Sequence, residues 1–394
     1  MPNRNYVLGT LVVLAGIVYV SLYPFHWRTP PLPGGPLHQF ALSWNHWPES
    51  RGDFIANLLL YLPWGFFGVR SLGRDKPAML RVVIATALGV ALSLCMETSQ
   101  AYIAERYTDM RDVYSNTLGS LGGAIAGLAP IGNSRMNILR DSRIAPFPAL
   151  LLAAFVASHL YPFMPVIDAH KYLTAVRPLL NTASLNRVDL ILTGITWLVI
   201  CYLAETLFGR RSAFLASIAI AALIFGGDIV IIDARLSLAS VLGAALAYLL
   251  WFALLRFIPG RVSLIAIAFA AVIMITRLLP FRLSPVGHGF EWVPFFALLR
   301  APIDIGLPAM IEKLFLYGGL IWLLMRAGLR LWRATVAVAL LLLFSSIVEM
   351  YMPGRDAGIT DALLALLIGT LLRLTLPPRR QRDRDDEEPE AKPA

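Results

Sequence analysis

The sequence predicts an all-α, polytopic integral membrane protein with about 12 transmembrane helices, and three observations lead to this. Hydrophobic residues make up 57% of the 394 residues and charged residues only 15%, whereas a soluble domain carries roughly 25% charged residues. Apolar runs of roughly 17 to 25 residues, long enough to cross a hydrocarbon core, recur along nearly the whole chain. The runs are apolar on all sides and do not alternate, which favours helices over barrel strands.

The predicted spans follow from these runs, taken in order. The first is expected to be a retained helix, because no A-x-A cleavage pattern follows it and the string from Ser21 to Phe25 comes directly after it. The second carries a proline within it, which bends a helix, and the fourth is rich in glycine, which favours close packing. After Pro378 the chain becomes a charged tail that should be disordered. The 12 spans are 6–23, 54–70, 80–97, 112–129, 146–162, 187–208, 212–232, 236–255, 262–279, 310–326, 333–350 and 360–376.

The net charge of +9 is interpreted as a topology signal, and no nucleic-acid partner is expected. With 12 spans and the N-terminus inside, 21 of the 34 Lys and Arg residues fall in the shorter, inner connections and the C-terminal tail. This distribution follows the positive-inside rule and predicts that both termini are cytoplasmic.

A short string marks an internal repeat. Leu22 to Phe25, Leu160 to Phe163 and Leu278 to Phe281 close the first, fifth and ninth spans, and each is read as Leu-x-Pro-Phe. After each string comes an outer segment rich in proline, histidine and aromatic residues, followed by three closely spaced spans. The chain is therefore predicted to hold three four-helix units, and because four is even, these are parallel repeats.

Polar residues gather at the outer ends of spans two to four of the first unit. On span two they lie four residues apart, on span three they lie three apart, and along the start of span four they step by three and four, so each set shares one helix face. Ionisable groups at membrane depth are costly and usually face a cavity or one another, so an outward-facing polar notch is predicted. The ligand-binding candidates are Asp53, Asn57, Glu97, Gln100, Arg106, Asp109, Asp112 and Asn116.

The later units keep thinner versions of this pattern. In the third unit the secondary candidates are Glu349, Arg355 and Asp361, and Glu312-Lys313 stands near the place of Asp53 and Asn57. The middle unit is more eroded and retains Asp228, Asp233 and Arg235.

A structural reading of the same residues stays open. Asp109 is suited to cap span four, with Asp112 completing a start that resembles a capping box. Acidic residues also complement the positive end of a helix dipole. Glu97 is placed to form a salt bridge with Arg106 or Arg111 that would fasten the three helices together.

These motifs resemble the VanZ-like family over about residues 6–130, with a degenerate copy over roughly 262–376. The matching strings are Asp53-x-x-x-Asn57, Tyr61-x-Pro63-x-Gly65, Glu97-x-x-Gln100 and Arg106-x-x-Asp109-x-x-Asp112-x-x-x-Asn116-x-x-Gly119. The resemblance implies a multi-pass protein of the bacterial cytoplasmic membrane with a role in the cell envelope. The family's namesake is associated with low-level resistance to the lipoglycopeptide teicoplanin. The expected organisation has four parts. These are a VanZ-like unit over residues 1–134, a degenerate middle unit over 135–258, a degenerate VanZ-like unit over 259–378 and a disordered tail over 379–394.

Three hypotheses of function fit these observations. The first is binding or transport of an amphipathic envelope component, such as a lipid-linked glycan precursor, a phospholipid headgroup or a lipoglycopeptide, with arginines on phosphate and carboxylates on hydroxyls or amines. The second is an intramembrane enzyme that acts on a lipid phosphate through Mg²⁺ or acid–base chemistry. The third is a structural scaffold. No hydrolase, metalloprotease or P-loop motif occurs and the histidines lack ligand spacing, so no resident metal or cofactor is predicted. Membrane lipids are expected partners.

Overall fold

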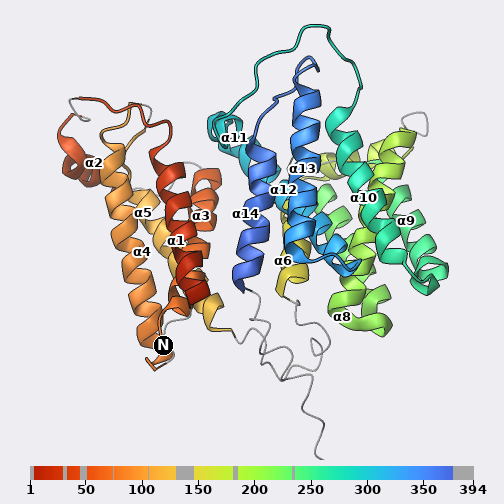
Figure 1. Cartoon of the computed structure of the whole chain (residues 1–394), viewed down its shortest axis with the longest axis horizontal. Coiled ribbons are helices and arrows are strands. Elements are labelled where there is room, and N and C mark those ends of the chain that lie inside the picture. The colour runs from red at the N-terminus through yellow and green to blue at the C-terminus, as the bar shows by residue number, and fades with distance from the viewer. Residues whose placement is uncertain are drawn as a thin grey trace, which may run out of the picture. The chain divides into compact units, whose positions relative to one another are not determined.

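The structure is a computed structural model that describes residues 4–29, 33–44, 51–73, 75–104, 106–129, 146–180, 185–232 and 236–375. In these ranges the regular elements are helices, joined by connections that contain three isolated β-bridges (Figure 1). The chain divides into two compact units. Of the described residues, the first holds those within 4–129 together with 371–375, and the second holds those within 146–370.

The first unit is a bundle of four long helices and one short one. Its long helices are mostly apolar, and α3 packs extensively against α5 and also contacts α1 and α4 (Figure 1). One part of its core joins Ile17 of α1, Tyr61 and Trp64 of α3 and Met96 of α4. The helices are α1 (Arg4–Leu22), α2 (Gly35–Ser43), α3 (Arg51–Ser71), α4 (Ala78–Gln100) and α5 (Met110–Leu128).

Glycines allow the backbones of α3 and α5 to approach each other closely. A Cβ atom added at Gly65 of α3 would overlap the backbone carbonyl of Ser120 in α5, and one added at Gly123 of α5 would overlap the carbonyl of Leu62 in α3. Helix association in a membrane depends on such small residues, because lipid provides no hydrophobic driving force between helices. The glycine-rich sequence of span four therefore serves close packing, as expected.

The second unit consists of longer helices with short helices in its connections. Its longest element, α8, contains a break at Gly209, whose φ of 79° and ψ of 161° are not helical, so that two helices meet there. The elements are α6 (Pro146–Leu160), α7 (Ala169–Val176), η1 (Arg177–Leu180), α8 (Arg187–Val230), α9 (Leu238–Ala253), η3 (Leu255–Phe257), α10 (Arg261–Leu278), α11 (Phe296–Arg300), α12 (Ile303–Arg326), α13 (Leu331–Glu349) and α14 (Thr360–Thr375).

Eight of the described helices are long and apolar enough to cross a membrane: α1, α3, α4, α8, α9 with the residues that follow it, α10, α12 and α13. Each of the 12 predicted spans coincides with a helix or, on either side of Gly209, with half of α8. The number of 12 crossings itself stays a prediction. Helices α6 and α14 are shorter, at 15 and 16 residues, and α5 starts with a charged turn that lowers its hydropathy.

The connections hold structure that apolar periodicity did not predict. Helices α2, α7 and α11 are short and lie in the segments expected to be outer loops. Several other predictions fall outside the described residues: the boundary at 134–135, the candidates Asp233 and Arg235, and the tail at 379–394.

Candidate functional site

The polar residues of the first unit come together where three helix ends meet. Asp53 lies in the first turn of α3, Glu97 and Gln100 lie in the last turn of α4, and Asp109 and Asp112 lie at the start of α5. We call Asp53, Glu97, Asp109 and Asp112 the Glu97 cluster. Its carboxylates range from exposed at Asp53, through half-buried at Asp109 and Asp112, to buried at Glu97.

Glu97 is the buried centre of this cluster, with only 3% of its surface exposed. Its Oε2 accepts a hydrogen bond of 3.0 Å from the backbone N–H of Asp109, and its backbone carbonyl accepts one of 2.8 Å from the Thr108 hydroxyl. Its charged neighbours are Asp112, Asp109 and Arg106. The C-terminal turn of α4 is thereby fastened to the start of α5.

Asp112 extends the cluster towards α3. Its carboxylate hydrogen-bonds with the Asn57 side chain, its negatively charged neighbours are Asp109 and Asp53, and its positively charged neighbour is Arg111. Asn57 is an amide and brings no charge. Within the described part of the chain, neither Glu97 nor Asp112 forms an ion pair, so the predicted salt bridge from Glu97 to Arg106 or Arg111 does not form.

Asp109 has the capping role that the structural reading assigned to it. It is the N-cap residue of α5, and its Oδ1 accepts a hydrogen bond of 2.8 Å from the backbone N–H of Arg111. The Arg111 guanidinium forms an ion pair with the same carboxylate, with Nε at 2.7 Å from Oδ2. An N-cap carboxylate satisfies a free N–H group at the positive end of the helix.

Two of the predicted residues turn away from the cluster and bind the end of α1. The Arg106 guanidinium donates to the backbone carbonyls of Tyr23 and Val20, each at 3.1 Å. The Gln100 amide donates to the carbonyl of Ser21 at 3.0 Å. These carbonyls lie in and just after the last turn of α1, where no intrahelical donor is left for them. Arg106 and Gln100 thus fasten α1 to the bundle.

Asn116 lies one turn deeper in α5 than Asp112. Its Nδ2 donates to the hydroxyl of Ser93 in α4 at 2.9 Å, and the residue is only 3% exposed. Its Oδ1 is buried and has no hydrogen-bond partner within the described part of the chain. An acceptor in that state is costly, so it marks a place where a donor fits.

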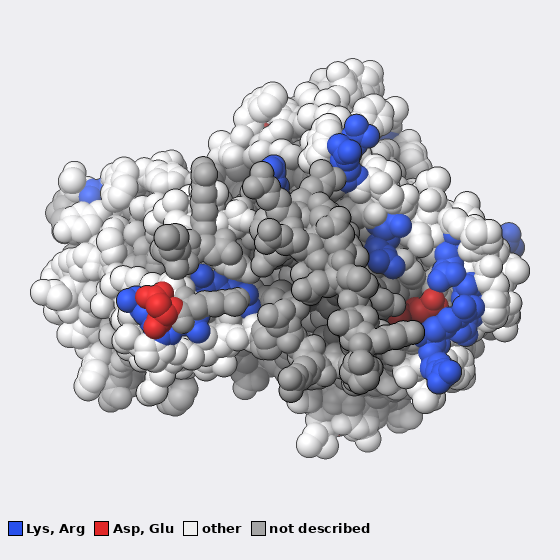
Figure 2. Space-filling model, turned by 60° about the horizontal axis from the view of Figure 1, so that its bottom comes forward, with Lys and Arg blue, Asp and Glu red and all other residues white. Residues whose placement is uncertain are grey.

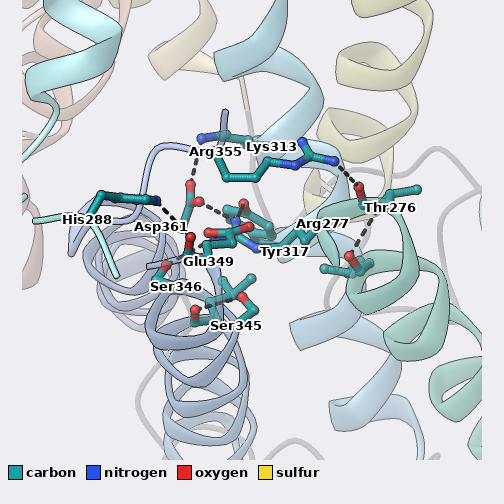
Figure 3. Close-up of polar contacts among 12 residues, drawn as sticks. Thr276, Arg277, His288, Lys313, Tyr317, Ser345, Ser346, Glu349, Arg355 and Asp361 are labelled. Carbon is teal, nitrogen blue, oxygen red and sulfur yellow. Dashed lines mark hydrogen bonds and ion pairs between the residues drawn. The ribbon is translucent and has the colours of Figure 1, made fainter. Parts of the chain in front are cut away.

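The secondary candidates form a second cluster, in the second unit, that sequence reasoning found only in part. Glu349 ends α13 and Asp361 begins α14, and both carboxylates accept hydrogen bonds from Arg277 of α10 (Figure 3). The distance from Arg277 Nη2 to Glu349 Oε2 is 2.7 Å, and Lys313 Nζ lies 2.7 Å from Asp361 Oδ1. We call these four residues the Arg277 cluster.

The Arg277 cluster is buried and electrically balanced. Glu349 and Asp361 are 4% and 7% exposed, and two cations face two carboxylates. Arg277 also donates to the Tyr317 hydroxyl at 3.0 Å and to the Ser346 hydroxyl at 3.1 Å (Figure 3). Arg277 was not predicted as a site residue. The signal that could have found it is an arginine inside an otherwise apolar span, three residues before Pro280.

Arg355, the third secondary candidate, does not join the two acids. Its guanidinium donates to the backbone carbonyl of Leu279 at 2.6 Å and to that of Thr276 at 3.3 Å (Figure 3). In the middle region, Asp228 lies near Lys171, whose ammonium group donates to the Asp228 backbone carbonyl at 2.9 Å. Among the described residues, no group of three or more His, Cys, Asp or Glu side chains is placed to hold a metal ion.

Comparison with known proteins identifies the first part of the chain. The VanZ/LLP1 family model matches residues 10–140, a range that includes most of α1, all of α2 to α5 and the Glu97 cluster. No curated protein and no solved structure matches the chain.

Proposed function

Starting from the membership of residues 10–140 in the VanZ/LLP1 family, we propose that this multi-pass membrane protein binds an amphipathic component of the bacterial cell envelope at the Glu97 cluster. One observation carries the proposal. Glu97 is buried beside Asp112, and in the described residues neither carboxylate has a cation paired with it. Buried carboxylates are stable only when charge or hydrogen bonds compensate them, so a ligand that brings donors would bind favourably here.

The setting of the cluster favours an amphipathic ligand. Helices α3 and α4, whose ends form the cluster, are both apolar enough to cross a membrane. A ligand with its polar headgroup at Glu97 would therefore have its apolar part beside these helices, in lipid. Lipid-linked glycan precursors, phospholipids and lipoglycopeptides all have this division between a headgroup rich in hydrogen-bonding groups and an apolar tail.

The proposal includes a repeated architecture of 12 spans, in which α10 to α14 form a second VanZ-like unit. Equivalent backbone turns support this part. Phe25, Phe163 and Phe281 each follow the proline of a Leu-x-Pro-Phe string, and their φ angles are 63°, 58° and 58°. In each turn the phenylalanine N–H donates to the carbonyl of the leucine three residues earlier. Positive φ is uncommon for phenylalanine, so chance recurrence at three such places is a poor explanation.

Equivalent arginines support the same correspondence. Arg106 donates to the carbonyls of the residue before Pro24 and of the residue four before it, and Arg355 does the same relative to Pro280. In each case the arginine lies six residues before the aspartate of the cluster, Asp112 or Asp361. Two arginines with matching targets and matching spacing are expected of homologous units.

The proposed topology places both termini in the cytoplasm, and the basic residues of each unit support it. In the first unit, Arg70 at the end of α3 donates to Ala129 after α5 and to Tyr6 near the start of α1. In the second, Arg256 donates to the carbonyl of Arg210 beside the α8 break. Figure 2 shows several separate groups of Lys and Arg side chains, in blue, at the surface. Basic connections stay preferentially on the cytoplasmic side.

Native mass spectrometry of the full chain, purified from bacterial membranes in mild detergent, tests the proposed function. The wild type should carry a bound amphiphile that the variant Glu97→Gln/Asp112→Asn loses. The control Asp75→Asn, which removes an exposed carboxylate in the connection between α3 and α4, should keep it. Equal amounts of bound amphiphile in all three proteins would contradict the proposal.

A further inference from the structure

The two clusters contain the same pair of acids at corresponding places. Glu97 and Glu349 lie in the last turns of α4 and α13, and Asp112 and Asp361 lie in the first turns of α5 and α14. Ser93 and Ser345 each lie four residues before the glutamate, and both are buried. The acids of the two clusters are therefore directly comparable, and what differs between the clusters is the group that faces them.

The cations of the Arg277 cluster stand where the first unit has neutral residues. Arg277 is three residues before Pro280, and the residue three before Pro24 is Ser21. Lys313 is four residues before Tyr317, and the residue four before Tyr61 is Asn57. The second correspondence also holds in contacts, since Asn57 hydrogen-bonds with Asp112 and Lys313 forms an ion pair with Asp361.

Ser21 lies beside the last turn of α4, the turn that contains Glu97. Its backbone carbonyl accepts the hydrogen bond from Gln100, which is three residues after Glu97 and in the last turn of α4. A long basic side chain at position 21 would start from this same helix end. In the second unit, Arg277 extends from the end of α10 to Glu349 of α13 in that way (Figure 3).

The first unit has Ser21 and Asn57 at the places of Arg277 and Lys313. From this difference we infer the chemical class of the ligand: the Glu97 cluster binds a cationic nitrogen group, an ammonium or guanidinium, in the place that Arg277 and Lys313 fill in the other cluster. The inference rests on the proposed function and specifies its ligand. Carboxylates accept hydrogen bonds and do not donate them, and the orphaned Oδ1 of Asn116 adds a further acceptor. Carboxylates placed together in this way select a ligand with several N–H donors and a positive charge.

The nearby arginines do not make the cluster a phosphate site. Arg111 forms an ion pair with Asp109, and Arg106 donates to two backbone carbonyls of the α1 end. A phosphate group at Glu97 would face the carboxylates of Asp112 and Asp109, and like charges at such positions repel each other. The cationic part of a headgroup is therefore the part that the cluster recognises.

The test uses the full chain in nanodiscs of phosphatidylglycerol, with thermal unfolding followed by tryptophan fluorescence. Short-chain phosphatidylethanolamine, short-chain phosphatidylglycerol and free ethanolamine are titrated separately. Phosphatidylethanolamine should raise the unfolding temperature and phosphatidylglycerol should not. If ethanolamine alone gives the same rise, the ammonium group is sufficient and a soluble amine is a possible source; if only the lipid does, the source is a lipid headgroup. Both results support a cationic ligand.

Designed variants locate the effect. In Ser21→Arg/Asn57→Lys, internal cations should fill the site and weaken the response to the amine by about tenfold or more in ligand concentration, the change expected from losing one charged contact. The control Leu37→Arg/Tyr107→Lys adds the same charge at exposed positions and should respond like the wild type. If the double variant does not fold, Asn57→Lys alone should show a smaller weakening.

Three results would overturn the inference. These are an equal response to phosphatidylglycerol, no response to either amine, and an amine response that survives in Ser21→Arg/Asn57→Lys and in Asn57→Lys. A phosphatidylglycerol response that disappears in Glu97→Gln/Asp112→Asn would reject the cationic ligand and leave the proposed function standing. A response that persists in Glu97→Gln/Asp112→Asn would reject both.

Discussion

Glu97 and Glu349 are the same side chain in two opposite electrostatic settings. Glu349 faces Arg277, with Asp361 and Lys313 completing two opposite pairs. Glu97 faces Asp112 and receives one backbone N–H. Removing one charge should therefore have opposite consequences in the two clusters, because removing one member of a balanced buried set leaves the others uncompensated.

We predict that Arg277→Met lowers the free energy of unfolding by about 3–5 kcal/mol, because Glu349 and Asp361 lose their shared cation. In ligand-free protein, Glu97→Gln should leave stability unchanged or raise it, because it removes a buried charge that forms no ion pair within the described part of the chain. Thermal and denaturant unfolding in one detergent compares the two variants. A strong loss of stability in Glu97→Gln would show that the Glu97 cluster is a structural ion network.

Residue identity and spacing predicted part of the arrangement of these side chains. Helical spacing was sufficient to place Glu97 near Asp112, because short connections force α3, α4 and α5 to be neighbours. It was not sufficient for Arg106, whose carbonyl partners belong to the end of α1 far away in sequence. Arg277 was missed because its partners come from α13 and α14, and a single arginine in an apolar run gives no spacing pattern to read.

At the scale of elements, the adjacent residues Gly122 and Gly123 of α5 test how closely α3 and α5 approach each other. Gly123 faces the backbone of α3, and a Cβ at Gly122 would have no atom within 4 Å. We predict that Gly123→Ala destabilises the protein by about 1–3 kcal/mol through overpacking. Gly122→Ala should be neutral or slightly stabilising, because alanine favours the helix by about 1 kcal/mol over glycine.

Unfolding curves of the two alanine variants, measured side by side in the same detergent, provide the check. Equal behaviour of the two variants would mean that α3 and α5 do not approach as closely as the structure shows.

The arginines that bind the ends of α1 and α10 should be equivalent in effect. Arg106→Gln and Arg355→Gln each remove charge-assisted hydrogen bonds to two backbone carbonyls. We expect each to cost about 1.5–3 kcal/mol, the usual contribution of hydrogen bonds to a charged group. Hydrogen exchange should show faster opening at Val20 and Tyr23 in the first variant and at Thr276 and Leu279 in the second. Unchanged exchange at these segments would argue against a fastening role.

At the scale of the whole molecule, the topology is open to chemical labelling. In a variant in which Cys95 and Cys201 are replaced by serine, single cysteines at Ile167 and at Arg211 report the two sides. Ile167 is 97% exposed in the connection between α6 and α7, and Arg211 lies beside the α8 break. We predict labelling of Ile167→Cys in spheroplasts by a membrane-impermeant maleimide, and of Arg211→Cys only after lysis. The opposite pattern would invert the orientation.

The helices were predictable from sequence because long apolar runs in a membrane protein have few alternatives to helix. The break at Gly209 was predictable as a gap between two spans, since the arginines beside it interrupt the apolar run. The short helices α2, α7 and α11 were not, because connections rich in proline and aromatic residues carry no apolar period that distinguishes helix from loop. The number of membrane crossings depends on α6 and α14, which have 15 and 16 residues, and on α5, which starts with a charged turn.

The most direct test of the central claim is an experimental density map of the full chain in a lipid nanodisc made from bacterial lipids. We predict density for a bound headgroup within hydrogen-bonding distance of Glu97 and Asp112, whereas at Glu349 and Asp361 the density should be that of Arg277 and Lys313 alone. A map of equal quality at both places, with only water against Glu97 and Asp112, would contradict the account.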